Sequence, residues 1–504
     1  MTLYNTAASL DRNADRRPDE IAVIFGERIT THRQLNDDVH VLAGALRALG
    51  IGTDDVVAII MGNCTEFLEV ALAINGAGAI FMPLNTRLAP AEWSYILRHA
   101  NCRAAVVGPG VVPSLPELRA ACTQLELVIG LADEDGVDVS FDKLLTEYAG
   151  AAAPFAARDS IDVSRLMYTS GTTARPKGVP ITYENVLWKI FDHVLEFGLT
   201  AQDRTVLAGP MYHVGAYDLP GTGTLYAGGS VVILPRFDAR ELLTAVQQHR
   251  ATNVWLAPAM FNAMMQLPDL DSFDTACLRF ITNGGEKMPT SLIERFEAAF
   301  PNTWLADAFG MTETVSGDTI LDQRHVLSKL GSVGKPVMHV DAKIVRDDDS
   351  TADPDEIGEL LLRGPKVFRG YWNDAEATER AFSDGWFRTG DLGHIDADGY
   401  LYIDDRKKDM IVSGGENIAT PEIERVLYLH PAVSEAAVVG MSDARWGQVP
   451  KAVVVLKPGA EASAEELMSH CAKQLAKYKV PKHVEFVDAL PRTASGKVMK
   501  RQLL

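Results

Sequence analysis

The segment YTSGTTARPKGV, residues 168–179, concentrates hydroxyl, glycine and lysine residues. Hydroxyl groups and glycine N–H groups donate hydrogen bonds, and Lys177 adds a positive charge, so the segment is suited to binding an anion such as a phosphate chain. It does not match the Walker pattern G-x-x-x-x-G-K-[ST], because Gly178 follows Lys177. The alternative is a polar surface turn, which most clusters of Ser, Thr, Gly and Pro form. Other parts of the chain have to distinguish the two.

The composition restricts the kinds of partner. The chain has 504 residues, of which 47% are hydrophobic, and a formal net charge of −19. The length allows two or more domains with a large core, and the acidic balance argues against nucleic acid, which requires a basic face. Small molecules are therefore the expected partners. The separated cysteines form no C-x-x-C pair and predict free thiols in a reducing, cytoplasmic compartment: Cys64, Cys102, Cys122, Cys277 and Cys471.

No membrane span is expected. The N-terminus carries acids and arginines where a signal peptide has an apolar run. The best apolar stretch, VALAINGAGAIFMPL, is short and is broken by glycines and a proline.

Apolar runs typical of buried strands alternate with helical patterns in the first half of the chain. Strands are predicted at 56–61, 80–84, 102–108, 228–235 and 253–258, and helices at 64–75, 90–101, 184–197 and 239–249. This rhythm is typical of β-α-β units with largely parallel strands. We interpret the Ala- and Pro-rich residues 148–160 as a linker between two subdomains, with a second α/β layer after it.

The pattern changes from residue 330, where short strands with Asp-Gly turns predict a small antiparallel β subdomain. Strands at 435–442 and 451–459 with a helix at 464–478 predict a compact C-terminal module. The expected fold is α/β: a large N-terminal domain of α/β layers plus a small β subdomain, followed by a small α+β C-terminal domain.

Four further segments accompany the opening one: PMYHVGAYD (210–218), DAFGMTET (307–314), GWFRTGDLG (385–393) with DDRKKDMIVSGGENI (404–418), and PRTASGKVMK (491–500). In this order they closely resemble the acyl-CoA synthetase branch of the adenylate-forming, AMP-binding enzyme superfamily. The resemblance implies an AMP-forming acid–thiol ligase that uses ATP, Mg²⁺ and coenzyme A. It also implies an AMP-binding domain over residues 1–407 and a mobile C-terminal domain over residues 408–504; a homodimer is one option for its assembly.

The resemblance implies an ATP site. Attack of a carboxylate on the α-phosphate is opposed by charge repulsion, so the site must supply cations and directed donors. Glu313 resembles the magnesium-linked carboxylate, Thr312 an α-phosphate donor, and Asp391 the carboxylate that binds both ribose hydroxyls. The other implied ATP-binding residues are Thr169, Ser170, Gly171, Thr172, Thr173, Lys177, Gly285, Glu286, Asp307, Phe309, Gly310 and Arg406. Thr169 is also implied at the metal, and Ala174 stands where a glycine is usual.

Some of these residues also have ordinary structural interpretations: an N-cap for Thr312, core packing for Phe309 and a solvated turn for DDRKKD. Lys497 in TASGK resembles the catalytic lysine that bridges the acyl carboxylate and the α-phosphate. A lysine so near a chain end is otherwise usually solvated. The implied catalytic residues are thus Lys497, Thr312 and Glu313.

The implied acyl pocket is mostly neutral. Its residues are His213, Tyr217, Asn283, Gly284, Met311 and Val315, with Gly285 beside them. Since none is Arg or Lys, a second carboxylate would be unpaired, and we expect a monocarboxylic acid, either aliphatic of medium length or aromatic. Val214 stands where peptide-synthetase adenylation domains have an Asp, which disfavours an α-amino acid.

The resemblance also implies a hinge at Lys408, about which the C-terminal domain rotates between the two half-reactions. The rotation would carry Ser413, Gly414, Gly415 and Glu416 toward the pantetheine tunnel for CoA.

Four alternative functions fit the sequence less well than a CoA ligase or differ from it in the acyl acceptor. An acyl-adenylating enzyme that passes the acyl group to a carrier protein or another nucleophile stays open. A luciferase-type oxygenase would need an oxidative step that no motif signals. A NAD-dependent dehydrogenase is rejected because Tyr226 occupies the last glycine position in GTGTLYAGG (221–229). A non-enzymatic binding module is less favoured still.

Overall fold

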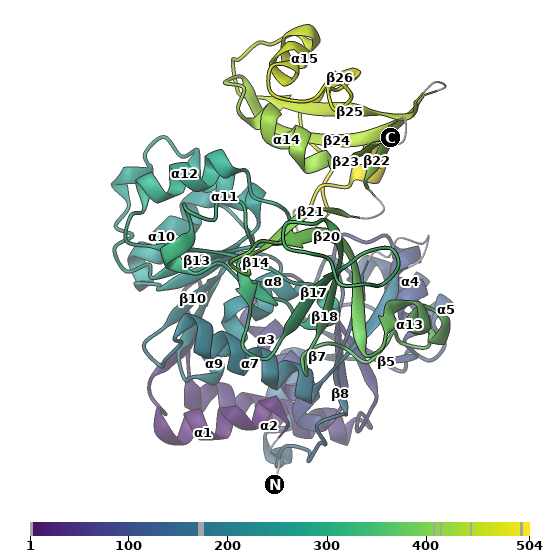
Figure 1. Cartoon of the computed structure of the whole chain (residues 1–504). Helices are drawn as coiled ribbons and strands as arrows, with labels where there is room; N and C mark the ends of the chain where they lie inside the picture. Colours follow the sequence, from purple (N-terminus) through teal and green to yellow (C-terminus); the bar gives the residue numbers. More distant parts are fainter. Residues whose placement is uncertain (1–3, 170–175, 407–408, 414–415, 444–445, 494–496) are drawn as a thin grey trace.

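The computed structural model describes residues 4–169, 176–406, 409–413, 416–443, 446–493 and 497–504 (Figure 1). One sheet contains strands β3 (Val56–Ile60), β4 (Ile80–Pro83), β5 (Cys102–Val107), β6 (Leu127–Gly130), β7 (Val139–Ser140), β8 (Val163–Thr169) and β9 (Lys177–Thr182). Their order is β7-β6-β5-β3-β4-β8-β9, and all neighbours are parallel except β8 and β9.

A second, nine-stranded sheet lies beside it. It contains β1 (Ile21–Phe25), β2 (Arg28–Thr31), β10 (Arg204–Leu207), β11 (Ser230–Ile233), β12 (Asn253–Leu256), β13 (Phe280–Asn283), β14 (Trp304–Phe309), β15 (Thr319–Ile320) and β16 (Lys335–Pro336). The order is β16-β15-β14-β13-β12-β10-β11-β1-β2, with a parallel centre and antiparallel pairs at both edges. The predicted second α/β layer is confirmed.

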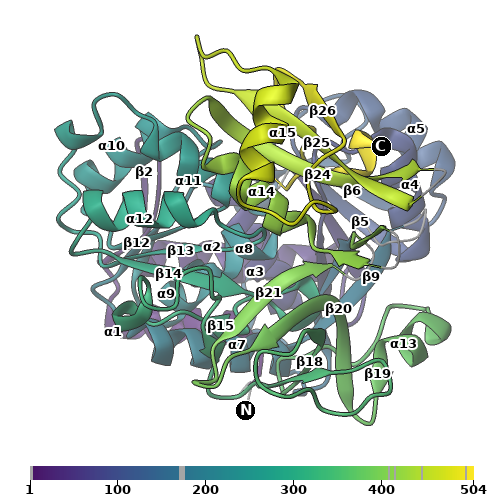
Figure 2. The same cartoon turned by 45° about the horizontal axis from the view of Figure 1, so that its top comes forward.

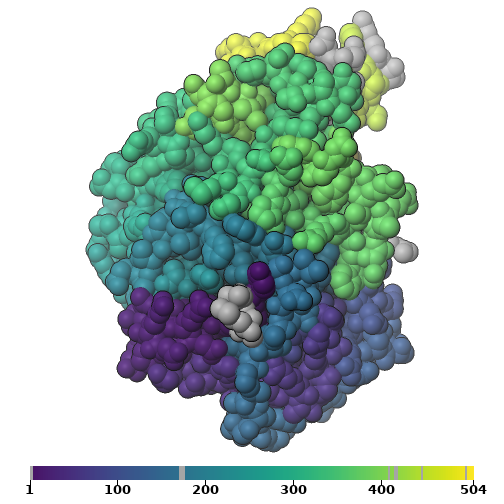
Figure 3. Space-filling model, turned by 60° about the horizontal axis from the view of Figure 1, so that its bottom comes forward, coloured from purple at the N-terminus to yellow at the C-terminus, as the bar shows by residue number. Residues whose placement is uncertain are grey.

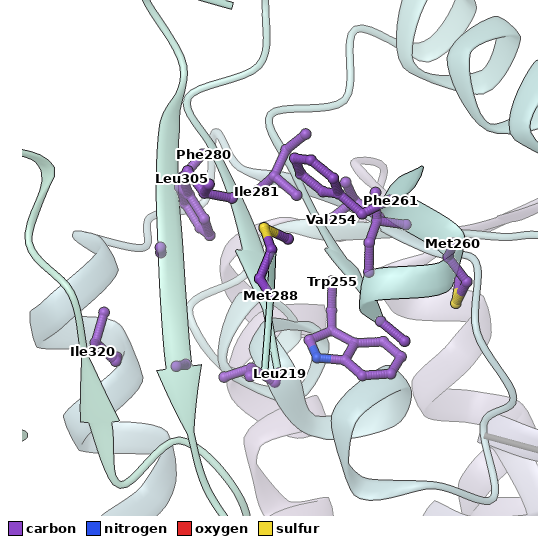
Figure 4. Close-up of a cluster of buried hydrophobic side chains, with 14 of the residues drawn as sticks. Leu219, Val254, Trp255, Met260, Phe261, Phe280, Ile281, Met288, Leu305 and Ile320 are labelled. Carbon is purple, nitrogen blue, oxygen red and sulfur yellow. The ribbon is translucent and has the colours of Figure 1, made fainter. Parts of the chain in front are cut away.

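The sheets and helices alternate in five layers. Helices α2 (His32–Ala48) and α3 (Thr65–Ala77) share a core with residues of both sheets, so they lie between them. Helices α4 (Pro90–His99) and α5 (Leu115–Ala121) cover the other face of the seven-stranded sheet. Helices α10 (Ala239–His249), α11 (Pro258–Met265) and α12 (Thr290–Ala299) cover the other face of the nine-stranded sheet, where Trp255, Phe261 and Phe280 join the core (Figure 4).

Strand β3 shows why the sequence pattern takes this form. Val57 and Ile59 pack against α2 and α3, while Val56, Ala58 and Ile60 pack into the core under α4 and α5. Side chains alternate across a strand, so a strand covered on both faces needs apolar residues at every position. The strands and helices predicted for residues 56–258 are confirmed, with ends that differ by at most two residues.

The linker predicted at residues 148–160 is wrong. After this segment the chain returns to the same sheet, where β8 pairs with β4. Phe155 is buried and stacks on His40 with ring centres 3.9 Å apart, and the Ala156 N–H donates to the Gly76 carbonyl. The segment therefore packs on α2 and α3, since its alanines and Phe155 supply apolar surface that a free linker would leave in water.

The predicted antiparallel β subdomain is confirmed. It contains β17 (Asp341–Val345), β18 (Gly358–Arg363), β19 (Phe382–Ser383), β20 (Trp386–Ile395) and β21 (Leu401–Arg406), with α13 (Ala375–Ala381) alongside. All pairings in this sheet are antiparallel.

The C-terminal module combines a sheet with two helices and lies above the rest of the chain in Figure 1 and in front of it in Figure 2. Its elements are β22 (Ile411–Ser413), β23 (Glu416–Ile418), α14 (Thr420–Tyr428), β24 (Val433–Asp443), β25 (Gly447–Leu456), α15 (Ala464–Ala472) and β26 (His483–Phe486). Helix α15 ends at Ala472 rather than at the predicted Tyr478. Between Ala472 and Tyr478 only Leu475 is buried, so there is little apolar surface to hold further turns.

Among the described residues, no helix is long and apolar enough to cross a bilayer. All five cysteines are free thiols.

Candidate active site

The candidate site lies at the carboxyl ends of the parallel strands. His213 follows β10, Glu286 follows β13 and Glu313 follows β14. In the sheet, β10, β12, β13 and β14 are consecutive, so the loops that leave them come together at one edge. Open α/β sheets bind ligands at this edge.

The opening segment begins in β8 and ends in β9, an antiparallel pair at the edge of the seven-stranded sheet. Thr169 and Lys177 are opposite each other in the antiparallel register. The predicted phosphate-loop residues Ser170, Gly171, Thr172 and Thr173 lie outside the described residues. The Lys177 Nζ lies 4.6 Å from the centre of the Tyr371 ring. A cation–π contact therefore holds this lysine at the start of β9.

Tyr371 also connects the hairpin to Glu313. Its hydroxyl donates to Glu313 Oε1 at 3.1 Å, and the Phe368 N–H donates to the Glu313 carbonyl at 2.7 Å. Glu313 is buried in the short helix Thr312–Thr314, and burial raises the pKa of its carboxyl, while Tyr371 and Arg406 oppose that change. The sequence analysis missed Tyr371. Its position in GYWN, within a segment rich in turns, was the only signal.

Asp391 and Arg406 face each other across β20 and β21. They are register partners, and the Arg406 Nε lies 3.0 Å from Asp391 Oδ1. Both act on the pKa of Glu313, in opposite directions, which places all three groups within electrostatic reach. The structure therefore brings together the acid predicted to bind ribose and an arginine predicted to bind ATP, beside the predicted magnesium ligand.

Asp307 and Asn283 form a similar pair across β13 and β14. Asn283 Nδ2 donates to Asp307 Oδ1 at 2.9 Å, and both side chains are buried. Burial raises the pKa of Asp307 to about 7, and the hydrogen bond from Asn283 opposes the rise. The side chain of Asn283, predicted in the acyl pocket, thus orients Asp307, an acid predicted to bind ATP. Phe309, at the end of β14, is partly buried against the core of the nine-stranded sheet.

His213 caps helix α8 (Val214–Tyr217). Its Nδ1 accepts a hydrogen bond from the Gly215 N–H at 3.1 Å, which assigns the hydrogen of the neutral ring to Nε2. Burial lowers the pKa of His213 to about 4, and nearby Lys497 lowers it further. The ring is therefore neutral at pH 7. It also faces Trp255, with ring centres 6.1 Å apart.

Trp255 is a residue that the sequence analysis missed. A Cβ added to Gly215 would lie 2.6 Å from the Trp255 ring, and one added to Gly284 would lie 3.9 Å from its Nε1. The indole thus fills the space between His213 and Gly284, two residues predicted for the acyl pocket. Nothing in the apolar run NVWLAP distinguishes it from an ordinary core residue.

The other predicted pocket residues divide between two cores. Val315 is buried in a cluster with Val214, and Met311 packs against it. The Tyr217 ring instead joins the core between the sheets, 5.9 Å from Phe67 and 6.3 Å from Phe81. Gly285 has a φ of 98°, and a Cβ added to Gly310 would lie 2.2 Å from the Gly317 nitrogen. At these two positions glycine is required by the backbone itself.

The C-terminal turn that carries Lys497 lies against the loop after β13. The Val498 N–H donates to Glu286 Oε1 at 2.5 Å, and the Arg492 Nη1 lies 3.4 Å from Glu286 Oε2. The Thr493 N–H donates to the Lys497 carbonyl at 2.7 Å, which closes the turn. Burial raises the pKa of Glu286, and these donors together with Lys497 oppose the rise. Glu286, predicted to bind ATP, here anchors the C-terminal module, and Lys497 lies near His213.

Lys408, Gly414 and Gly415 lie outside the described residues. Ser413 is buried and pairs with both Glu416 and Gly447, so this part of the predicted CoA segment is the end of a β-hairpin.

Comparisons with known proteins agree with this arrangement. The family model described as "AMP-binding enzyme" matches residues 10–372, and the one described as "AMP-binding enzyme C-terminal domain" matches residues 422–497. The chain is 39% identical to an indoleacetate–CoA ligase of Aromatoleum aromaticum over 98% of this chain and 97% of the relative. It is 38% identical to a feruloyl-CoA synthase of an Amycolatopsis species over the same shares of the two chains.

Among solved structures, the anthranilate CoA ligase AuaEII in complex with anthranoyl-AMP has a TM-score of 0.92 and 29% sequence identity. The match covers 99% of this chain and 96% of that one.

Proposed function

The chain belongs to the AMP-binding enzyme family, and we propose that it is an acid–CoA ligase. In this reaction a carboxylate attacks the α-phosphate of ATP to form acyl-AMP and pyrophosphate. The CoA thiol then attacks the acyl carbon and releases AMP. The observation that carries the proposal is the contact between the C-terminal module and Glu286. The Val498 N–H, next to Lys497 in sequence, donates to Glu286, and this contact brings the charge of Lys497 within electrostatic reach of His213.

Lys497 meets the main electrostatic need of the first half-reaction. Two anions, the acyl carboxylate and the α-phosphate, must approach each other, and a cation between them offsets their repulsion. His213 is neutral at pH 7 because burial lowers its pKa to about 4. The histidine therefore adds no second charge, and its ring is suited to packing beside the acyl group.

The proposed nucleotide site combines hydrogen-bond donors and acceptors from β8, β9, β14, β20 and β21. We assign Lys177, with Thr169 and the turn that follows it, to the phosphates, Asp391 and Arg406 to the ribose, and Asp307 to the adenine amino group. Glu313 fits a magnesium ion, since its buried carboxylate has a raised pKa that a nearby divalent cation would lower. Magnesium bound there would neutralise charge on the phosphates.

For the second half-reaction we propose a rotation of the C-terminal module about Lys408. The module's described contacts with the N-terminal part run through Glu286 and through Asp405, which accepts hydrogen bonds from the Thr420 N–H and hydroxyl. Hinge closure needs only a few residues that change conformation. After the rotation, the hairpin that contains Ser413 would replace Lys497 at the site.

We propose a monocarboxylic acid as substrate, and an aromatic acid ahead of an aliphatic acid of medium length. Trp255 and His213 supply flat surfaces next to Gly284. Aromatic rings pack favourably against such surfaces. The relatives named above act, by their names, on feruloyl, indoleacetate and anthranilate groups.

The test is ATP-dependent release of pyrophosphate with a panel of benzoate, phenylacetate, cinnamate and hexanoate, with and without CoA. We expect release with at least one aromatic acid and a thioester product only when CoA is present. Pyrophosphate release that CoA does not convert to thioester would favour the alternative, in which a carrier protein or another nucleophile accepts the acyl group. No release with any acid would contradict the proposed function.

A further inference from the structure

A cavity of about 60 Å³ lies behind Tyr217. Most of its wall is apolar and comes from helices α3 and α7 (Tyr183–Phe197) and from β4: Leu68, Ala71, Phe81 and Ile190. Helix α1 (Ser9–Arg16) and the segment around Leu225 line its other side. Figure 3 shows the N-terminal segment, in purple, next to the teal middle part of the chain, on the face opposite the C-terminal module. Helix α1 and the segment around Leu225 are joined by a hydrogen bond from the Asn13 Nδ2 to the Leu225 carbonyl.

Charged groups are present in this apolar wall. Arg165 on β8 and Asp218 both line the cavity and are almost fully buried, and the Arg165 Nη1 donates to Asp218 Oδ2 at 2.7 Å. The Lys189 Nζ, also fully buried, lies 3.8 Å from Asp218 Oδ1 and donates to Thr222 Oγ1 at 2.6 Å. Two basic side chains therefore share one carboxylate.

Arg165 is incompletely satisfied. Its guanidinium carbon lies 5.5 Å from the centre of the Phe81 ring and 5.9 Å from that of Tyr217. Its Nε and Nη2 are buried, and neither has a hydrogen-bond acceptor among the described residues. A buried donor without an acceptor is unfavourable, and a charged one more so, so this arginine needs an acceptor that the described protein does not supply.

The cavity is close to the reaction centre. Tyr217 and His213 are one helical turn apart, and the Tyr217 N–H donates to the His213 carbonyl at 3.0 Å. One turn rises about 5.4 Å, which is about the length of an aromatic ring. An acyl group that begins beside His213 and passes Tyr217 therefore reaches the cavity with its far end.

We propose that the cavity is the distal end of the acyl pocket and that Arg165 binds an oxygen atom there. The substrate class is then a carboxylic acid whose far end carries a hydrogen-bond acceptor, such as a hydroxyl or carbonyl group. This inference rests on the proposed function, because it needs the carboxylate at the other end to be the one activated. Tyr217 and Phe81 form the apolar collar through which the acyl group passes, and Ala71 limits its length.

The experiment compares matched acids by pyrophosphate exchange. For each of benzoate, phenylacetate and cinnamate, the ring carries hydroxyl, methyl or carboxylate in the para position; hexanoate is compared with its 6-hydroxy and 6-carboxy forms. A hydrogen bond to a charged donor predicts that kcat/KM for the hydroxyl form exceeds that for the methyl form by about 10- to 100-fold on the preferred scaffold. Arg165→Met should bring this ratio close to one.

Two variants control for folding. Arg158→Met removes another buried arginine that is paired with aspartates, Asp54 and Asp162, but does not line the cavity, and it should keep the wild-type ratio. Ala71→Leu fills the cavity and leaves Arg165 in place, so it should lower kcat/KM for the para-substituted acids more than for the unsubstituted ones. Because each ratio is measured within one variant, a general loss of folded protein cancels.

The outcomes separate the two proposals. If the carboxylate form is preferred and Arg165→Met removes that preference, the proposed Arg165 subsite is supported. The proposal of a monocarboxylic substrate is then contradicted. If acids are adenylated but kcat/KM is the same for the methyl and the hydroxyl form, Arg165 does not bind the substrate and the proposed subsite is wrong. If no acid supports exchange, the proposed function fails and the subsite with it.

Discussion

At the residue scale, chemistry at this site depends on side chains from distant parts of the sequence whose charges are set by burial. His213 is kept neutral by burial with Lys497 nearby, and Asp307 is held close to half-protonation at pH 7, with its pKa raised to about 7. We propose that Lys497 contributes the cation that neither of them supplies. Substitution of Lys497 and of Asp307 each has a measurable effect that follows from these charges.

Lys497→Ala is expected to separate the half-reactions. The lysine stabilises charge that develops as the carboxylate attacks the α-phosphate, so its loss should slow pyrophosphate exchange by at least about a hundredfold. Supplied acyl-AMP and CoA should still give thioester at close to the wild-type rate. Lys477→Ala, an exposed lysine of the same module, is the control. An equal loss in both half-reactions would make Lys497 a structural residue.

Asp307→Asn is expected to change the pH dependence of stability. The folded pKa of Asp307, about 7, is above the ordinary aspartate value of 3.8, so between these values the folded state holds a proton that the unfolded state releases. In that window the free energy of unfolding falls as pH rises, by up to about 1.4 kcal/mol per pH unit from this group. Asparagine keeps the acceptor for Asn283 and has no proton to lose. Urea unfolding of both proteins at pH 5 and 6.5 measures the difference, and identical slopes would contradict it.

At the element scale, the loop between β14 and β15 positions the residues proposed to bind magnesium and phosphate. Val315, Ser316 and Gly317 all have positive φ, at 58°, 71° and 65°, and this conformation is unfavourable for a β-branched residue such as valine. The fully buried Lys366 holds the loop, since its Nζ donates to the carbonyls of Ser316 at 2.7 Å and Gly317 at 2.6 Å. It also lies 3.1 Å from Asp318 Oδ1, and Asp318 accepts from Thr314.

Lys366→Met is therefore expected to loosen the loop that carries Glu313. We expect pyrophosphate exchange to fall about tenfold or more and to require more Mg²⁺ for half-maximal rate, because Glu313 is less well positioned. The loss of a buried ion-pair partner should also lower the free energy of unfolding by about 3–5 kcal/mol. A purely structural role would lower stability without moving the Mg²⁺ midpoint. Conversion of supplied acyl-AMP to thioester provides the internal control.

At the scale of the whole molecule, a small set of contacts holds the C-terminal module in the arrangement that suits adenylation. Glu286 receives both the Val498 N–H and Arg492, and Asp405 at the end of β21 accepts hydrogen bonds from the Thr420 N–H and hydroxyl. Such a small contact between two units is compatible with rotation, because few interactions have to break.

Glu286→Ala is expected to weaken this arrangement. The variant loses a charge-assisted hydrogen bond, which is worth roughly 1.5–3 kcal/mol, so pyrophosphate exchange should fall about tenfold or more. The thioester half-reaction should be unchanged or faster. Glu435→Ala removes the other acid that contacts Arg492, at 2.7 Å within the module, and is the matched control. A drop in the thioester rate alone would contradict the anchoring role.

Lys408→Pro is expected to have the opposite effect. Proline fixes φ and would restrict the proposed hinge, so acyl-AMP should still form while CoA-dependent turnover falls. Single-turnover formation of acyl-AMP and of thioester measures the two steps. Equal loss of both would count against a hinge at this position.

The sequence alone determined the fold class and the identity of most candidate residues. Continuous apolar runs such as residues 56–60 predict buried parallel strands, because both faces of such strands are covered, and local motifs identify Glu313, Asp391 and Lys497. The segment 148–160 was misread because its composition is that of a linker; only the position of Phe155 between helices shows that it packs.

Only the tertiary structure decided what these residues touch. The pairing of Asp391 with Arg406 follows from strand register, and the anchoring role of Glu286 follows from where the C-terminal turn lies. Trp255, Lys366 and Arg165 carry no local signal, and Tyr371 only a weak one, since an aromatic or basic side chain acquires its role from neighbours far away in the chain. The physical reason is that burial and long-range contacts determine the pKa values of these groups and whether their buried hydrogen-bond donors have acceptors. Residues adjacent in sequence reveal neither the burial nor the contacts.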